Sequence, residues 1–210
     1  MSSPTPASTL LDVRNLSFRY RESGNDVLHG VTLRIRNRDR ILVEGPSGSG
    51  KSTLGTLMSG LRSPHSGLLL LQGLDPASIG TEAWRKRIAS APQFHENHIL
   101  SNTLAFNILM CRQWPPRKED LREAETICRE LGLGPLLDRM PGGLMQRVGE
   151  TGWQLSHGER SRVYLARALL QGAELVILDE SFASLDPETQ TQALECARTR
   201  APTLMVIAHP

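Results

Sequence analysis

The sequence predicts an α/β fold with a parallel-sheet core, an antiparallel β flank and a helical subdomain. Three observations lead to this prediction. Residues 11–35 alternate between apolar and polar side chains on either side of a turn at Gly24–Asp26, as paired antiparallel strands do. Leu175–Leu178 and Leu204–Ala208 are nearly continuous apolar runs, which is typical of strands covered on both faces of a parallel sheet. Within residues 94–155, apolar side chains recur instead at helical spacing.

The individual elements follow from the same patterns. Short strands are expected at Leu11–Tyr20, Val31–Ile35, Arg40–Glu44, Leu68–Leu71 and Ile88–Ala91, in addition to the two buried runs. The strand Arg40–Glu44 leads into a glycine-rich loop, after which Ser52–Leu61 is expected to be a helix with Gly60 close to its end. Pro187–Arg198 is expected to be the helix that crosses between the two buried strands.

We predict three parts along the chain. Residues 1–9 are rich in Ser, Pro and Thr and are expected to form a flexible tail. Residues 10–93 and 156–210 would form the core, and residues 94–155 the helical subdomain. The clearest helix of that subdomain follows Pro115-Pro116, and its apolar positions end at Gly132.

Composition limits the function. The chain has 210 residues and a formal net charge of +2, which is too mild to indicate a nucleic-acid partner. Its three cysteines lie far apart, without metal-ligand spacing, and favour a reducing, cytosolic setting. No apolar stretch approaches the ~20 residues that cross a bilayer, so a membrane role would require a partner or a segment outside this sequence.

The strongest motif lies between the third strand and the first helix. Residues 45–52, GPSGSGKS, fit the pattern G-x-x-x-x-G-K-[ST] in the strand–loop–helix context that the motif requires. Glycines let backbone N–H groups close around phosphates, Lys51 reaches the β and γ phosphates, and Ser52 can ligate Mg²⁺. The alternative is a Gly-Ser loop that only caps a helix. Motif and context together favour a P-loop NTPase core.

Two further segments carry candidate chemistry. The strand that ends in Asp179 and Glu180 brings two carboxylates to the edge where open α/β sheets bind ligands. We expect Asp179 to hold the Mg²⁺ shell and Glu180 to orient or deprotonate the attacking water. Ser156 and Glu159 have the spacing of a capping box at a helix start, and with Gly158 that start is also a potential anion site. Capping alone would explain both residues.

In their order along the chain, these segments resemble the ABC-type ATPases. The resemblance covers the chain from about Leu11 to His209 and implies ATP and Mg²⁺ as cofactors. It assigns base stacking to Tyr20, a contact near Mg²⁺ and the water to Gln93, and a γ-phosphate contact to His209. By the same match, the segment Ser184–Asp186 is the D-loop of the family. The implied nucleotide-binding residues are Tyr20, Gly45, Ser47, Gly48, Ser49, Gly50, Lys51, Ser52, Thr53, Ser156, Gly158 and Asp186.

In this family two cassettes face each other head to tail, so Ser156 would close over the ATP held by the partner's loop. Hydrolysis would then require a homodimer or heterodimer. Residues 140–152, just before Ser156, and residues 101–108 resemble the exporter branch, which implies transmembrane partners and a place on the cytoplasmic side of the membrane. Both segments could instead be simple turns and helix starts. An importer subunit and a degenerate cassette with little hydrolysis remain the alternatives.

The sequence departs from the family pattern at two positions of the Ser156 segment. His157 stands where a glycine is usual, and Glu159 where a glutamine is usual. A carboxylate there would repel the γ-phosphate unless the helix cap occupies it, so we expect a functional but slower site. The family also continues past its switch histidine, which implies that the C-terminal part of the usual cassette is missing from this sequence.

Two other classes fit less well. The ABC proteins of chromosome and DNA-repair machines carry long coiled coils between loop and signature, whereas here Lys51 and Ser156 are 105 positions apart (156 minus 51) without sustained heptads. A GTPase would carry a guanine-reading Asn-Lys-x-Asp sequence, which is absent.

Overall fold

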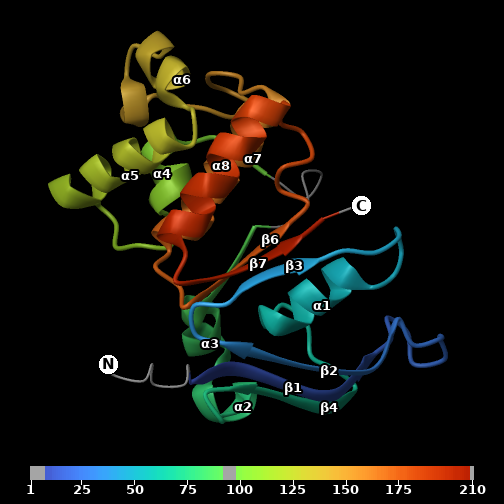
Figure 1. Ribbon diagram of the computed structural model, residues 1–210. Helices are drawn as coiled ribbons and strands as arrows, with labels where there is room; N and C mark the ends of the chain where they lie inside the picture. Colours follow the sequence, from blue (N-terminus) through green and yellow to red (C-terminus); the bar gives the residue numbers. More distant parts are fainter. Residues whose placement is uncertain (1–7, 92–97, 209–210) are drawn as a thin grey trace, which may run out of the picture. The chain divides into compact units, whose positions relative to one another are not determined.

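A computed structural model describes residues 8–91 and 98–208 of the chain, and these residues form two compact units (Figure 1). The first unit contains the described residues up to Ser90, together with Glu174–Ile177 and the described residues from Pro202 onwards. The second contains the described residues from Ala91 to Ala173 and from Leu178 to Ala201. Each unit therefore combines segments that are far apart in the sequence.

The first unit contains the antiparallel sheet that the alternating pattern predicts. Its strands are β1 (Thr9–Phe18), β2 (Leu28–Arg36) and β4 (Ser66–Leu71), in the order β2-β1-β4. Leu11 lies opposite both Ile35 of β2 and Leu71 of β4, and all three side chains are fully buried. One face of this sheet therefore lies on the core.

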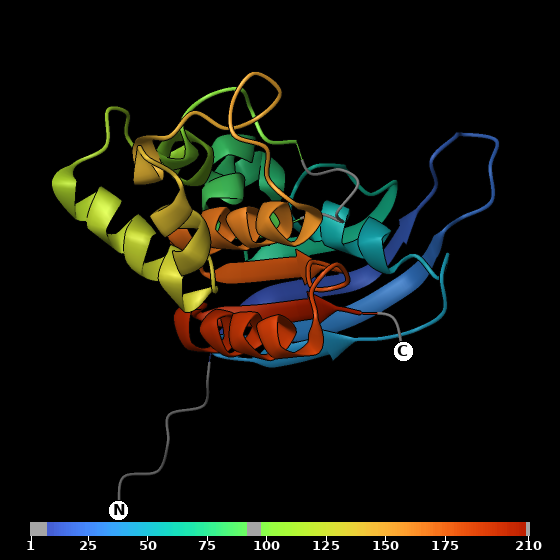
Figure 2. The ribbon, with the colours of Figure 1, turned by 90° about the horizontal axis from the view of Figure 1, so that it is seen from above.

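The second sheet has the order β3-β7-β6-β5, so neighbouring strands are distant in sequence. Its strands are β3 (Arg40–Val43), β7 (Thr203–Ile207), β6 (Leu175–Asp179) and β5 (Ile88–Ala91). β3 and β7 run parallel and side by side, from Arg40 opposite Leu204 to Val43 opposite Ile207 (Figures 1 and 2). All five residues of β6 are buried, which explains its continuous apolar sequence.

Three helices belong to the first unit: α1 (Lys51–Met58), α2 (Pro76–Ile79) and α3 (Thr81–Arg87). Gly55 of α1 lies so close to the sheet that a Cβ there would be 3.2 Å from Ile207 and 3.6 Å from Ile177. Trp84 of α3 is fully buried, and its indole N–H donates to the carbonyl of Met58 at 2.9 Å. The end of α1 is therefore tied to α3 within one core.

The second unit is built from helices. They are α4 (Leu104–Leu109), α5 (Lys118–Glu130), α6 (Gly134–Arg139), a 3₁₀ turn (Gly143–Met145), α7 (His157–Leu170) and α8 (Pro187–Arg200). α7 packs against α4, α5 and α8. The buried amide of Asn107 in α4 accepts from the backbone N–H of Leu100 and donates to its carbonyl, which fixes the segment before α4. α5 and α8 are joined by the ion pair of Glu130 with Arg200.

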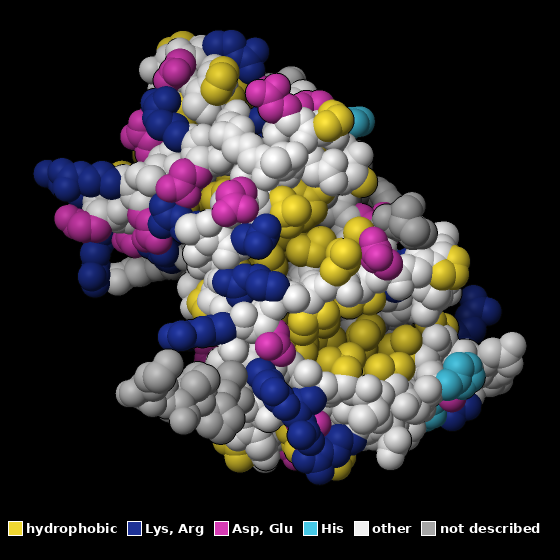
Figure 3. All heavy atoms as spheres, viewed as in Figure 1, with side chains coloured by type: hydrophobic (Ala, Val, Ile, Leu, Met, Phe, Trp, Pro, Cys, Tyr) yellow, Lys and Arg dark blue, Asp and Glu magenta, His cyan; other side chains and the backbone are white. Residues whose placement is uncertain are grey.

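Charged side chains of both signs are interspersed over α5 and α8 (Figure 3). Several form ion pairs along one helix, such as those of Arg129 with Glu125 and of Arg198 with Glu195. Pairing of this kind is typical of a solvated helix face.

Across residues 8–91 and 98–208, no helix has both the length and the apolar character needed to span a membrane.

The structure confirms the predicted fold class and corrects some boundaries. The first helix ends at Met58 and not at Leu61, because Gly60 adopts a left-handed φ of 71° that stops the helix. The crossover helix α8 continues to Arg200, two residues past the predicted end. α7 and α8 lie in the second unit, whereas the sequence grouped residues 156–210 with the core; that functional division stays a prediction.

Candidate functional site

The glycine loop of the first unit encloses the side chain of Lys51. The loop runs from the end of β3 to the first residue of α1, which is Lys51 itself. The Lys51 Nζ donates to the carbonyl oxygens of Gly45 at 2.7 Å and Pro46 at 3.0 Å, and the residue is only 9% exposed. A positive charge is thus held at the N-terminus of a helix, where the backbone dipoles also favour an anion.

The other residues predicted for this loop occupy two environments. Ser47, Gly48 and Ser49 form its exposed tip, and Gly50 is buried behind them. Ser52 is half-buried in the first turn of α1. Its hydroxyl is the kind of hard oxygen donor that Mg²⁺ takes, and so, in the other unit, is the Asp179 carboxylate. The donor chemistry of these residues therefore fits a magnesium ion.

The loop glycines allow a prediction with an internal control. Gly48 and Gly50 both have left-handed backbones, with φ of 77° and 89°. A Cβ at Gly50 would lie 2.7 Å from the Leu28 side chain and 3.0 Å from the Val27 carbonyl, whereas at Gly48 it would meet nothing within 4 Å. We expect Gly50→Ala to lower the free energy of unfolding by about 1 kcal/mol more than Gly48→Ala, because only the former adds a clash. Urea unfolding of both variants would measure this, and equal losses would contradict it.

Tyr20 lies beside this loop within the same unit. Its hydroxyl hydrogen-bonds with that of Thr53 in α1 at 2.9 Å, and its ring meets Phe18 edge to face at 5.1 Å. The Arg62 guanidinium lies 5.0 Å from the Tyr20 ring centroid. Tyr20 remains 56% exposed, so part of its surface is open to a ligand. The structure places Tyr20 next to Thr53, another residue predicted to bind the nucleotide, and adds Arg62, which no motif indicated.

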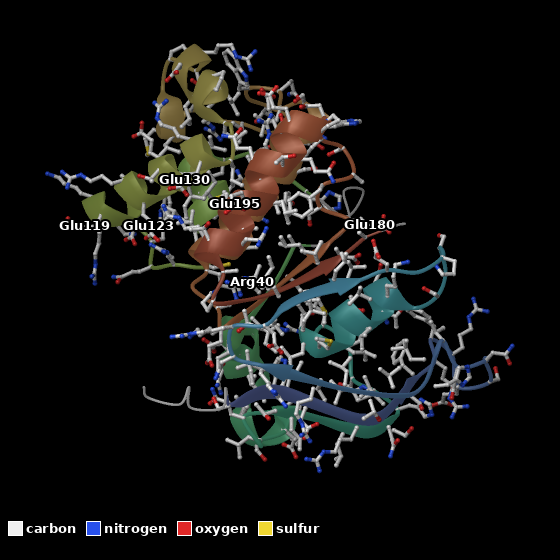
Figure 4. The ribbon with its side chains drawn as sticks, in the orientation of Figure 1. Arg40, Glu119, Glu123, Glu130, Glu180 and Glu195 are labelled. Atoms are coloured by element: carbon white, nitrogen blue, oxygen red, sulfur yellow. The ribbon has the colours of Figure 1, made fainter. Side chains whose placement is uncertain are left out.

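The carboxylate strand β6 ends in an unusual backbone conformation. Asp179 is its last residue and is 7% exposed, and Glu180 follows with a left-handed φ of 47° (Figure 4). The Glu180 carbonyl then accepts from the N–H of Ala183 at 3.1 Å, which closes a turn. A side chain is rarely held in this backbone region without a compensating reason, and such positions cluster at functional sites.

The start of α7 is a complete capping box, as predicted. The Ser156 hydroxyl accepts from the Glu159 N–H at 3.3 Å, and the Glu159 carboxylate accepts from the Ser156 N–H at 2.8 Å. Each residue thereby satisfies a backbone donor of the first turn. The carboxylate of Glu159 also accepts from Arg139 at 2.7 Å, a contact that the sequence did not reveal.

The same helix start lies against the Ser184–Asp186 segment of its own unit. A Cβ on Gly158 would be 3.4 Å from the Leu185 side chain and 3.5 Å from the Ser184 carbonyl, which are ordinary contact distances, so the two segments lie side by side. The hydroxyls of Ser161 and Ser184 hydrogen-bond at 2.7 Å. Asp186 caps α8 by accepting from the Thr189 N–H at 3.0 Å, and this bond holds the pKa of Asp186 below its usual range. Asp186 thus has a structural role in addition to the predicted one.

The two segments singled out as exporter-like are neighbours in the structure. Thr103 and Arg147 form an antiparallel bridge, and the Val148 N–H donates to the Asn102 carbonyl at 2.9 Å. Gly149 has a φ of 94°, and a Cβ on it would lie 3.0 Å from the Ser101 Cα. No sequence pattern indicates this pairing. Gln93 and His209, the remaining predicted site residues, lie outside the described residues.

The chain is an α/β protein of the P-loop nucleotide-binding class. This class is defined by a strand, a glycine loop around a buried lysine and a helix, together with a second strand that ends in two carboxylates. Comparison with known proteins gives the family. The family model described as ABC transporter matches residues 28–183, and the chain belongs to that family.

Three relatives show the range of proteins to which the chain is similar. It is 34% identical over 207 residues to the "Mycobactin import ATP-binding/permease protein IrtB" of Mycolicibacterium thermoresistibile, covering 98% of this chain and 34% of that protein. It is 36% identical over 201 residues to the "Glutathione/L-cysteine transport system ATP-binding/permease protein CydC" of Escherichia coli, covering 95% and 34%. It is 34% identical over 204 residues to the "ATP-dependent lipid A-core flippase" of Neisseria meningitidis, covering 95% and 31%.

A solved structure agrees with these relatives. The fold matches that of a bacterial Atm1-family ABC exporter with ATP bound, with a TM-score of 0.83 and 28% identity, over 100% of this chain and 36% of that one. The chain therefore spans about a third of the length of these three relatives and of this structure.

Proposed function

We propose that this chain is the domain of an ABC exporter that binds ATP and hydrolyses it to ADP and phosphate. The observation that carries the proposal is the enclosure of the Lys51 ammonium by the carbonyls of Gly45 and Pro46 at the start of α1. A ligand phosphate can compete for this ammonium and for the N–H groups of the helix start. Membership of the ABC transporter family makes ATP the natural ligand.

Each predicted residue takes a role in this proposal. The residues from Gly45 to Thr53 would hold the phosphates, and Tyr20 would stack on the adenine with the face that Arg62 leaves open. Ser52, Gln93 and Asp179 would hold Mg²⁺, which supplies charge neutralisation on the phosphate oxygens when bound. Glu180 would orient or deprotonate the attacking water, and His209 would contact the γ-phosphate.

Catalysis would require a second ABC ATPase domain, identical or different. Ser156 and Gly158 at the start of α7 would contact the phosphates of the ATP held by the other domain. The backbone donors of a capped helix start and its dipole suit that contact. Asp186 lies in the segment that packs on this helix start, so we place it in the same interface. Closure around ATP would exclude water, and opening after hydrolysis would drive the transporter.

The exporter assignment draws on two observations. One relative is named as a flippase and the matched structure as an exporter. The two exporter-like segments pair with each other through Thr103 and Arg147, so they form one surface. We propose that this surface contacts transmembrane domains on the cytoplasmic side of the membrane. Because another relative is named for import, the direction of transport needs its own measurement in a reconstituted transporter.

The test measures ATP turnover at increasing protein concentration with Mg²⁺ present. Phosphate release is the readout. We expect the rate per chain to rise with concentration until two chains pair, because each site would be completed by the other copy. A control without Mg²⁺ should bind ATP but release little phosphate. Turnover strictly proportional to concentration would contradict the paired site, and ATP binding without turnover at any concentration would contradict hydrolysis.

A further inference from the structure

The carboxylate of Glu159 lies in the first turn of α7, where the proposed function places an ATP phosphate. One carboxylate oxygen accepts from the Ser156 N–H at 2.8 Å, and the other accepts from the Arg139 guanidinium at 2.7 Å. The Glu159 side chain is 12% exposed and that of Arg139 is 61% exposed. A nearly buried carboxylate thus forms an ion pair with a largely exposed arginine.

The other arginines near this turn donate to carbonyl groups. Arg160 donates to the Leu155 carbonyl at 3.1 Å. Arg162 donates to the carbonyls of Gly158 at 3.0 Å and Gly132 at 2.7 Å, and burial lowers its pKa from the usual value. Arg139 is therefore the arginine in direct contact with the Glu159 carboxylate, and Glu159 also attracts the Arg162 guanidinium, which opposes the lowering of the Arg162 pKa.

The side chain of Arg139 is also held by a hydrogen bond within its own helix. It is the last residue of α6, and its Nε donates to the Pro135 carbonyl at 3.2 Å within that helix. A guanidinium held on one side keeps its remaining donors in a defined direction, so less freedom is lost on pairing. The charge on Glu159 is thus matched by a residue from a separate element, 20 positions earlier in the chain.

An unmatched carboxylate in this turn would oppose the binding of a phosphate. Two anions within a few ångströms repel each other, and in a site closed to water the repulsion is poorly screened. Arg139 places a positive charge on the same carboxylate and so offsets part of this cost. The capping box is kept, since the other carboxylate oxygen still accepts from Ser156.

We propose that Arg139 is a positioning residue for the nucleotide, and that it makes Glu159 compatible with the ATP phosphates by neutralising its charge. The inference rests on the proposed pairing of two domains around ATP. The glutamate at the start of α7 is then compatible with ATP binding only when the arginine at the end of α6 is present.

The experiment measures ATP-driven dimerisation of the full chain by sedimentation, in a Glu180→Gln background that is expected to retain bound ATP. Arg139→Gln is expected to weaken dimerisation about tenfold, because Glu159 loses the positive charge that directly contacts its carboxylate beside the phosphate. Adding Glu159→Gln to Arg139→Gln should restore dimerisation to near the parent value. Arg139→Lys, which keeps the charge, should stay within about threefold of the parent. Arg198→Gln, which removes an arginine from an exposed ion pair with Glu195, is the matched control.

Thermal unfolding without ATP separates this role from a purely structural one. If the pair only stabilised the fold, Arg139→Gln would lower Tm and leave the dimerisation constant of the folded chain unchanged, which would overturn the inference. Failure of Glu159→Gln to rescue, or equal losses in Arg139→Lys and Arg139→Gln, would also overturn it. A parent that binds ATP but never dimerises would instead refute the proposed pairing, and this inference with it.

Discussion

Replacing Lys51 by alanine is expected to weaken ATP binding by about 100-fold or more, because the substitution removes the positive charge held at the phosphate site. It would also leave the carbonyls of Gly45 and Pro46 without the donor that now joins them. Titration with a fluorescent ATP analogue, alongside circular dichroism to confirm folding, would measure the effect.

The control for this variant is Lys86→Ala. Lys86 forms an exposed ion pair with Glu82 on α3 at 2.7 Å, so its replacement removes the same charge from a solvated helix face. ATP affinity should then be unchanged. If Lys51→Ala bound ATP within threefold of the unmodified chain, the glycine loop would not be the nucleotide site, and the proposed function would lose its main support.

Replacing Glu180 by glutamine is expected to lower ATP turnover by about 10²–10⁴-fold while ATP binding is retained, which is the usual contribution of a general base. The two side chains have the same shape, so the backbone turn at Glu180 should be preserved. Single-turnover phosphate release and equilibrium binding would separate the two effects.

Glu195→Gln provides the comparison for this substitution. Glu195 lies on α8 with its side chain 69% exposed, and Figure 4 shows it on a different element from Glu180. Turnover in this variant should match that of the parent. A Glu180→Gln chain with more than a tenth of the parent turnover would rule out Glu180 as the base and direct attention to another carboxylate or to a water held by the phosphates.

The parts of this protein that sequence could predict are those decided by local chemistry. The glycine pattern around Lys51 requires a loop between a strand and a helix, and the structure has that loop. The Ser156 and Glu159 spacing specifies a capping box, and both of its hydrogen bonds are present. The continuous apolar run of β6 predicts a strand buried at every position, as it is. In each case the determining residues lie within a few positions of one another.

The parts that escaped prediction depend on residues distant in the chain. Arg139 and Glu159 meet because α6 ends beside the start of α7, and no pattern around either residue indicates the other. Arg62 reaches the ring of Tyr20 for a similar reason. The pairing of Thr103 with Arg147 joins two segments whose sequences were each recognisable but gave no register. Such contacts are set by tertiary packing, which one sequence does not specify.

The strand order has a consequence for how the chain acquires its structure during synthesis. The partner of β3 in the sheet is β7, with Arg40 opposite Leu204, and β7 also lies between β3 and β6. On the ribosome, the strand that carries the lysine loop can therefore pair with β7 only after the segment between Val43 and Thr203 has been made. Pairing over such long separations is slow and leaves strand edges exposed. We therefore expect nascent chains that stop before Thr203 to depend on chaperones, with the β1-β2-β4 sheet forming first because its three strands are complete by Leu71.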